Sequence, residues 1–410
     1  MNDQDQMDFY RNLHFYYKHL FPIQMIVDWL SYAKDNQPEL RYFSRREFSF
    51  ERSIDGETFY QRYQQFQNAY GLQKFLLDNK QNDQTSTLIK YDIGAVFDKL
   101  PKKGEKLKAM EKEIVIDIDM DAYDEVRTCC QGAKICEKCW KFLQVACDIL
   151  RPALFQDFGL EHILAVYSGR RGIHLWVCDS HIRKSTNEVR SAIIGYLNIN
   201  TGNADAEEII REVKQEKVEK LHPSIQRAYF IAQQFFKQII LIDQNSLKIE
   251  NVKKKILTIL KQTKILNPKL EKSIQEINDS SQIWDLICSQ DSERLEIAKL
   301  QIILMCLYPR LDAHVSTTIN HLLKGPFSIH PKTQRVCVPF NLKNSSQFNP
   351  LDTPTLPSII KQLAQLPDEL KQRENENKIF PFLGKEIPSL SPYIQLFEDF
   401  ISKYNKPKIN

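Results

Sequence analysis

The feature that most constrains this chain is a strand-like run whose end carries acidic residues in alternation. The run Glu113–Asp121 starts with the apolar stretch Ile114–Ile116 and continues with Asp117, Asp119 and Asp121. A β-strand places every second side chain on one face, so Asp117 and Asp119 must share a face about 6–7 Å apart along the strand. Two carboxylates this close repel each other unless a cation lies between them. The run therefore predicts a strand that ends in a divalent-metal site.

The alternative is that these carboxylates form the solvated end of a surface strand, as isolated pairs of aspartates usually do. The unbroken apolar stretch before Asp117 instead favours a strand buried on both faces. Buried carboxylates need a partner, and a metal ion is the natural one. Asp121 lies beyond the apolar stretch and is expected in solvent. We therefore expect Asp117 and Asp119 to hold the metal.

Four cysteines follow within eleven residues, namely Cys129, Cys130, Cys136 and Cys139. Four soft thiolate ligands without an open position are typical of a tetrahedral structural Zn²⁺ site. The alternative is a group of unpaired core thiols, but the surrounding sequence is hydrophilic. The chain has nine cysteines, and a disulfide scaffold is not expected at this length in a reducing compartment. The spacing predicts structural zinc.

A third pattern combines glycines with basic residues. Two strand-like, mainly apolar runs, Ile163–Tyr167 and Ile173–Cys178, flank the tight turn Ser168–Gly172 and predict a β-hairpin with a Gly-Arg-Arg-Gly tip. Glycines allow backbone N–H groups to approach an anion, and arginine binds phosphate oxygens bidentately. Adjacent arginines in a turn are more often simply exposed, but Ser168 and His174 beside Arg170 and Arg171 favour a phosphate site. Further on, Lys324 and His330 flank a Gly-Pro turn and could both bind phosphate, although each residue alone is more often an ordinary polar residue of the surface or core.

Composition indicates an ordinary globular protein and sets limits on the function. The chain has 410 residues, 42% hydrophobic and 26% charged, which allows two or three domains. No apolar stretch reaches the roughly 20 residues that cross a bilayer, and the acidic N-terminus is unlike a targeting signal. A net charge of +4 means that nucleic-acid contacts must come from local patches. We expect a cytosolic or nuclear protein without membrane contact.

The distribution of glycine predicts the domain organisation. No glycine occurs between residues 203 and 324, and apolar residues recur there at helical spacing. We expect a catalytic core in two parts at 1–184 and 293–350, with a zinc motif at 129–139, an inserted helical subdomain at 185–292 and a partly helical tail at 351–410.

Taken in order, the motifs resemble the small, catalytic subunit of eukaryotic DNA primase. The resemblance runs from about residue 9 to 345, and it thins through the helical insertion. It rests on the following segments: Tyr16–Pro22, Arg45–Phe50, Arg62–Gln64, Asp92–Val96, Asp117–Met120, the four cysteines with Trp140, Ser168–Asp179, Arg310–Asp312 and Asn320–Thr333. Two departures, Ala313–Thr317 and Gly325, lie beside the expected site without removing a ligand, and they leave the details of substrate binding in question.

The resemblance implies an α/β (mixed α+β) archaeo-eukaryotic primase fold, in which two small sheets form the catalytic cleft. It implies that Asp117, Asp119 and Asp312 bind two Mg²⁺ or Mn²⁺ ions. The triphosphate of the incoming nucleotide would be held by Ser168, Arg170, Arg171, His174, Lys324 and His330. Positions near the nucleotide sugar and phosphates would be Glu47, Arg62, Lys90 and Asp92. The four cysteines would be the zinc ligands.

The activity implied is synthesis of short RNA primers on single-stranded DNA by two-metal nucleotidyl transfer. The implied partners are a large iron–sulfur subunit and DNA polymerase alpha, and the implied location is the nucleus. Two alternatives stay open: a primase-polymerase of the same superfamily that uses dNTPs, and a zinc-stabilised, non-catalytic nucleic-acid-binding subunit.

Overall fold

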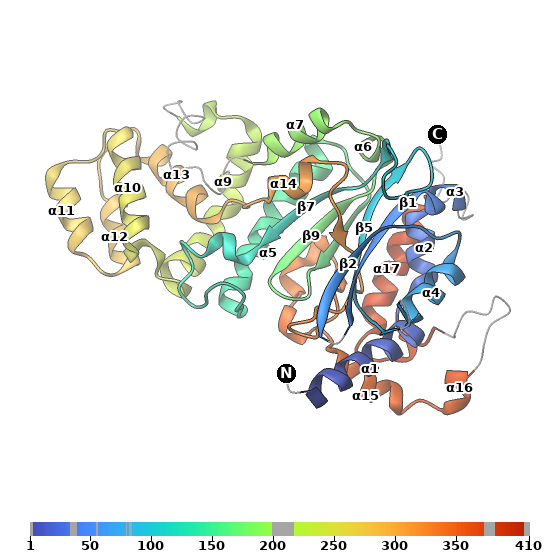
Figure 1. Cartoon of the computed structure of the whole chain (residues 1–410). Helices are drawn as coiled ribbons and strands as arrows, with labels where there is room; N and C mark the ends of the chain where they lie inside the picture. The colour runs from blue at the N-terminus through green and yellow to red at the C-terminus, as the bar shows by residue number, and fades with distance from the viewer. Residues whose placement is uncertain are drawn as a thin grey trace.

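Two small antiparallel sheets form the centre of the molecule, and helices surround them (Figure 1). The computed structural model describes residues 3–32, 39–54, 56–78, 80–81, 84–198, 217–372 and 382–405. One sheet has the order β10-β5-β1-β2 with β6 also paired to β5, and its strands are β1 Arg46–Ile54, β2 Glu57–Gln64, β5 Thr87–Phe97, β6 Ala109–Glu111 and β10 Leu323–Lys324. The other has the order β11-β8-β9-β7, with β7 Ile114–Asp119, β8 Ile163–Tyr167, β9 Gly172–Val177 and β11 Pro339–Phe340. The expected mixed α/β class with two small sheets is confirmed.

The helices gather in two regions. Those near the sheets are α1 Asp3–His19, α2 Ile23–Leu30, α3 Leu40–Ser44, α4 Ala69–Leu77, α5 Glu137–Pro152, α6 Ser180–Arg183, α7 Asn187–Leu197, α14 Ala313–Thr317, α15 Leu356–Ala364, α16 Asp368–Gln372 and α17 Ser391–Tyr404. A second group extends to one side, with α10–α12 farthest from the sheets (Figure 1): α9 Pro223–Phe236, α10 Glu250–Gln262, α11 Pro268–Glu276, α12 Ser280–Cys288 and α13 Leu295–Leu307. The described part of the glycine-free region is thus mainly helical.

Local sequence explains where several of these helices start and stop. Asn267 accepts a hydrogen bond from the N–H of Leu270, and Pro268 occupies the first turn of α11, where its missing N–H costs nothing. The side chain of Asp279 caps α12 in the same way. Helix α13 is apolar on nearly all sides, and its residues from Leu300 to Leu307 are all buried, as expected for a helix inside the core.

A buried ion pair joins the two sheets. Arg46 on β1 donates to the Glu113 carboxylate, directly before β7, at 3.2 Å, and both side chains are fully buried. The hydroxyl of Tyr32 also donates to Glu113, at 2.7 Å, and Arg46 donates to the Gly94 carbonyl at 2.9 Å. These contacts satisfy both charges, so the pair fixes how β1 and β7 lie relative to each other.

Aromatic packing connects the second helix, α2, with the last described helix, α17. Trp29 in α2 packs edge-on against Trp176 in β9, with ring centres 5.4 Å apart. Phe397 in α17 lies 5.9 Å from Trp29 and 5.3 Å from Phe327. All four side chains are buried. The C-terminal helix therefore completes the core that begins near the N-terminus.

Candidate active site and metal sites

The paired aspartates lie at the end of β7, next to the hairpin formed by β8 and β9. In the antiparallel register Asp117 is opposite His174, and Asp119 is opposite Gly172. The burial pattern of β7 leaves only these two aspartates partly accessible, because Ile114, Val115, Ile116 and Ile118 are buried. A β-carbon at position 172 would lie 2.2 Å from the Asp119 carboxylate. Glycine at this position therefore makes room for the second aspartate.

Asp312 reaches the same place from a distant part of the sequence. Its backbone N–H donates to the Asp117 carbonyl at 2.9 Å. Its side chain caps α14 by accepting hydrogen bonds from the N–H groups of His314 and Val315. The hydroxyl of Ser316 in α14 donates to the Val115 carbonyl at 2.7 Å, which holds this short helix against β7. Asp312 is thus held next to Asp117 by its backbone, close enough for its charge to act on the Asp117 carboxyl.

The electrostatics of these carboxylates fit a cation. Burial, with Asp119 and Asp312 nearby, raises the pKa of Asp117 to about 7. Burial also raises the pKa of Asp119, although Arg171 opposes this effect. One carboxylate oxygen of Asp117 is buried without a hydrogen-bond partner. An unpartnered buried oxygen beside two further carboxylates is a suitable donor set for a hard divalent cation.

The basic side chains line the same cleft, which has a volume of about 390 Å³. Arg171 bridges Asp119 and Asp121, at 3.1 Å and 2.7 Å, so Asp121 is paired and not simply solvated. The ammonium group of Lys324 donates to the Ser168 carbonyl, which ties β10 to the hairpin. The cleft thus has an acidic side and a basic side that already touch through Arg171.

Both histidines of the cleft are neutral at pH 7. Burial and the Lys324 charge lower the pKa of His174 to about 3. Burial, Lys324 and Arg170 lower the pKa of His330 to about 3 as well. A neutral imidazole can donate one hydrogen bond and accept another, so these side chains can bind phosphate oxygens as hydrogen-bonding groups without adding charge.

The four residues matched to the sugar region fall into two groups. Lys90 and Asp92 line the cleft from β5, and their side chains are 3.6 Å apart. The hydroxyl of Tyr60 donates to Asp92 at 2.5 Å. Glu47 is buried and pairs with Arg62 at 3.0 Å, but neither residue lines the cleft.

Most predicted residues therefore converge, and several others were missed. Besides Lys90 and Asp92, eight of the predicted residues line the cleft: Asp117, Asp119, Ser168, Arg170, Arg171, His174, Lys324 and His330. Asp312 donates its N–H to the Asp117 carbonyl but does not line the cleft. Lining residues that the sequence did not single out are Glu51, Leu322, Leu323, Pro331 and Lys332. For Leu322, Leu323, Pro331 and Lys332, the sequence offered one signal, which was their position beside Lys324 or His330.

Lys112, which the sequence did not single out, supports the segment that carries Lys324. The ammonium group of Lys112 is buried and donates to the His321 carbonyl, three residues before Lys324. Burial lowers the pKa of Lys112 to about 7. Arg190 in α7 donates to the Lys112 carbonyl at 2.6 Å and so fixes the backbone at this point. Lys112 thus anchors the segment that carries Lys324.

The four cysteines form one compact cluster. One sulfur from each of Cys129, Cys130, Cys136 and Cys139 lies within 4.8 Å of all the others. The sulfurs of Cys136 and Cys129 are 3.5 Å apart, and those of Cys136 and Cys139 are 3.9 Å apart. A tetrahedron with Zn–S bonds of about 2.3 Å has sulfur–sulfur edges of about 3.8 Å. The adjacent pair of cysteines therefore fits a closed zinc site.

The cluster is tied to the helical region by a residue that the sequence did not reveal. Gln244, which is buried, donates to the Cys129 sulfur at 3.3 Å and accepts from the Thr128 N–H at 2.8 Å. The hydroxyl of Ser246 donates to the Val126 carbonyl at 2.5 Å. Residues 244–246 follow α9, so the segment bearing Cys129 is fastened to the helices beyond the sheets.

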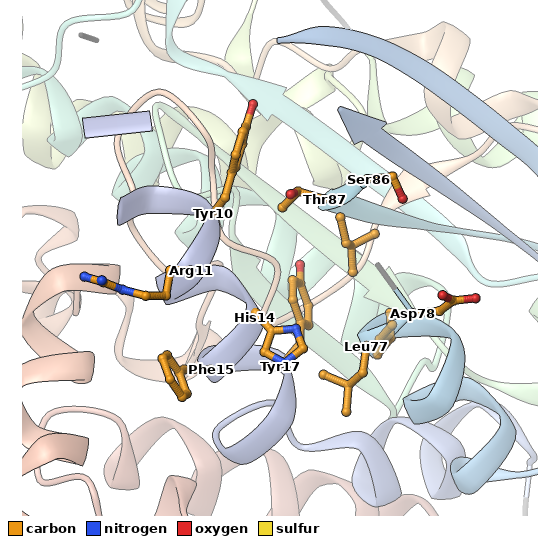
Figure 2. A pocket seen from close by; sticks show the side chains of 11 residues that line it. Tyr10, Arg11, His14, Phe15, Tyr17, Leu77, Asp78, Ser86 and Thr87 are labelled. Atoms are coloured by element: carbon orange, nitrogen blue, oxygen red, sulfur yellow. The ribbon is translucent and has the colours of Figure 1, made fainter. Parts of the chain in front are cut away.

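A second cavity, of about 310 Å³, lies between α1, α4 and β5 (Figure 2). Side chains of α1, including Tyr10, His14 and Tyr17, point into it, and Leu77 and Asp78 lie on the side of α4. The cavity is mainly apolar, and its charged lining residues are Arg11 and Asp78. It therefore lacks the two neighbouring carboxylates of the cleft.

Comparison with known proteins identifies the family. The family model described as DNA primase small subunit matches residues 116–342. The DNA primase small subunit of Schizosaccharomyces pombe is 33% identical, with 96% of this chain and 89% of the relative covered. The chain belongs to the DNA primase small subunit family. Its Drosophila melanogaster relative is 34% identical (95% and 90% covered), and that of Saccharomyces cerevisiae 31% (97% and 92%).

Membership in the DNA primase small subunit family makes this chain a catalytic primase-polymerase, and thus a nucleotidyltransferase. Among solved structures, the polymerase domain of Mycobacterium tuberculosis Ligase D in complex with DNA aligns with 86% of this chain and 88% of its own, at a TM-score of 0.34 and 11% identity. That similarity is too low to support an inference. In the described part of the chain, no helix is long and apolar enough to span a bilayer.

Proposed function

We propose that this DNA primase small subunit makes short RNA primers de novo on single-stranded DNA. The observation that carries the proposal is one cleft lined both by the carboxylates Asp117 and Asp119 and by basic and imidazole groups, with Asp312 bonded through its N–H to the Asp117 carbonyl. Joining two nucleotides requires a binding site for cations beside a binding site for a triphosphate, and this cleft has both kinds of side chain.

The three aspartates would hold two Mg²⁺ or Mn²⁺ ions. Such ions lower the pKa of an attacking 3′-hydroxyl and neutralise the charge of the departing pyrophosphate. Asp312 uses Oδ1 to cap α14, which leaves its other carboxylate oxygen to bind a cation. The orphaned oxygen of Asp117 supports the assignment, because a cation would supply the partner that the protein does not.

The hairpin and the Lys324 segment would hold the triphosphate. Charged and hydrogen-bonding groups for its oxygens are provided by Ser168, Arg170, Arg171, His174, Lys324 and His330. Arg171 is shared between Asp119 and Asp121, and a phosphate would therefore compete with these carboxylates for its guanidinium. This exchange would couple nucleotide binding to the charge at the metal site.

The sugar of the nucleotide would lie toward β5. Lys90 and Asp92 line this side of the cleft, and Tyr60 orients Asp92. Glu47 and Arg62 would act from outside the cleft, through the backbone of β1 and β2, because their side chains pair with each other.

The remaining assignments follow from the family. The cysteine cluster would hold structural Zn²⁺, since its four thiols leave no open position for substrate. Primer synthesis for replication would take place in the nucleus, in a primosome with the iron–sulfur large subunit and DNA polymerase alpha. The division into a core of 1–184 and 293–350, a helical insertion of 185–292 and a tail of 351–410 stays part of this proposal.

The test is RNA synthesis on single-stranded poly(dT) with ATP and Mg²⁺ or Mn²⁺, comparing the wild type with Asp117→Ala/Asp119→Ala. We expect labelled short oligomers from the wild type alone. If folded wild-type protein with the large subunit makes no product, the proposal is wrong. Products that require dNTPs and an existing primer would instead indicate a DNA-synthesising primase-polymerase. Equal binding of DNA without synthesis by either protein would indicate a non-catalytic subunit.

A further inference from the structure

The loop between β5 and β6 presents an unusual density of positive charge. Between Asp98 and Met110 the chain has five lysines and two acidic residues. Four of the lysines have exposed side chains without an ion pair to any described residue, namely Lys102, Lys103, Lys106 and Lys108. The fifth, Lys99, pairs with Glu105 at 2.8 Å.

The loop is held in a defined shape. The N–H of Asp98 donates to the Lys108 carbonyl at 3.0 Å, and the N–H of Lys108 donates to the Asp98 carboxylate at 3.1 Å. Within the loop, the N–H of Glu105 donates to the Lys102 carbonyl at 3.3 Å, and Gly104 makes the turn with φ +85°. The backbone is thus closed at its base, and the lysines project from a fixed frame.

Several lysines of the described helical region are instead paired within the protein. The helical region is also rich in lysine, but Lys254 pairs with Glu250 one turn away, and Lys255 pairs with Glu125 at 2.7 Å. Lys253 is buried and donates to two backbone carbonyls. Those charges are largely neutralised by the protein itself. Four lysine charges of the β5–β6 loop are not neutralised by any described residue, so this loop can bind an anionic partner.

We propose that the β5–β6 loop, residues 98–110, binds the phosphate backbone of the single-stranded DNA template outside the cleft. The inference rests on the proposed function and identifies a surface that holds its substrate. Point-like ammonium groups on flexible stems suit a sugar–phosphate backbone, where charge repeats regularly and no base is read.

The position of the loop favours the template over an acidic protein. Strand β5 carries Asp92 at the cleft and reaches the loop six residues later, about 20 Å away at 3.3 Å per residue. A stacked strand with one phosphate every 3.4 Å spans about six nucleotides over this distance. One continuous DNA strand can therefore occupy the cleft and contact the loop, whereas a protein partner needs no connection to the cleft.

The experiment measures binding of fluorescein-labelled (dT)30 by anisotropy between 50 and 500 mM NaCl. The variant is Lys102→Gln/Lys103→Gln/Lys106→Gln, and the matched control replaces three exposed lysines on other elements, Lys237→Gln/Lys343→Gln/Lys361→Gln. Each phosphate contact to a single strand contributes a slope of about 0.7 in the plot of log affinity against log salt. We expect the loop variant to lose about 2 from the slope and to bind at least tenfold more weakly at 50 mM salt, while the control loses neither.

Several results would overturn the inference. An unchanged slope in the loop variant, an equal loss in the control, or no binding by the wild type at 50 mM salt would each do so. So would a loop variant that binds DNA normally but no longer binds the large subunit, which would make the loop a protein interface. Because ATP binds about 20 Å away, its affinity should be unchanged in the variant. The two proposals can fail separately. If the loop variant shows the expected loss of slope but the wild type makes no primers, the proposed function is wrong and the DNA-binding role of the loop still holds.

Discussion

At the scale of single residues, two glycines make room for functional side chains. Gly172 lies against Asp119, as described above. Gly325, one of the two departures from the family pattern, lies against Tyr91. A β-carbon there would be 2.2 Å from the tyrosine ring, whose hydroxyl donates to the Pro326 carbonyl at 2.5 Å. The departure at position 325 is therefore matched by the large side chain at position 91.

Replacement of Gly172 by alanine should displace the Asp119 carboxylate. We expect Gly172→Ala to reduce primer synthesis at least tenfold and to weaken Mn²⁺ binding, with little change in the secondary structure seen by circular dichroism. Gly195→Ala is the control, since nothing lies within 4 Å of a β-carbon in that helical position. Full activity in Gly172→Ala would show that the Asp119 position is not critical.

The raised pKa of Asp117 predicts how metal binding depends on pH. Below a pKa of about 7 the carboxyl holds a proton that a cation must displace, and above it the carboxylate is free. The dissociation constant for Mn²⁺, measured by calorimetry, should rise about tenfold per pH unit below 7 and level off above 8. The same affinity at pH 5.5 and pH 8 would contradict this. Asp117→Asn should bind weakly at every pH.

Residue patterns predicted the site only where its parts are local. The alternation of Asp117 and Asp119 indicated a shared face, and the register of β7 bears this out. The approach of Asp312 could not be derived from spacing, because it depends on one backbone hydrogen bond between segments nearly two hundred positions apart. Only the resemblance indicated it. Lys112 gave no signal, since a lysine beside a strand is ordinarily exposed.

At the scale of elements, the zinc loop connects the sheets to the helices. Cys136 and Cys139 begin α5, while Cys129 is held by Gln244 from beyond α9. The hairpin of β8 and β9 was predictable because two apolar runs flank a short turn that contains two glycines. The two-residue strands β10 and β11 were not, since so short a segment has no periodicity and is defined only by its partners.

Loss of zinc should loosen this connection. We expect chelation, or Cys136→Ser, to lower the thermal unfolding midpoint by several degrees, because the metal would tie the Cys129–Cys130 segment to the start of α5. Gln244→Ala should give a smaller loss and keep bound zinc, as measured by atomic absorption. A folded, metal-free Cys136→Ser protein with an unchanged midpoint would show that the cluster is not a structural metal site.

At the scale of the whole molecule, the Arg46–Glu113 pair determines how the two sheets meet. Glu113→Gln keeps the shape of the side chain but leaves Arg46 as a buried charge without a counter-ion. Its free energy of unfolding, from urea titration, should fall by about 3–5 kcal/mol. The double variant Arg46→Met/Glu113→Leu should be less destabilised than the single one, because no charge remains buried. A loss below about 1 kcal/mol in Glu113→Gln would contradict this account.

The packing of Phe397 on Trp29 has a consequence for how the protein is made in the cell. Roughly 370 residues separate these two rings, and at about 5–20 residues per second a ribosome needs about 20–70 s to add them. During that time the buried face of α2 has no partner from α17. The nascent chain therefore leaves this part of α2 uncovered until translation is nearly finished, and a chain that stops before α17 lacks the cover over Trp29.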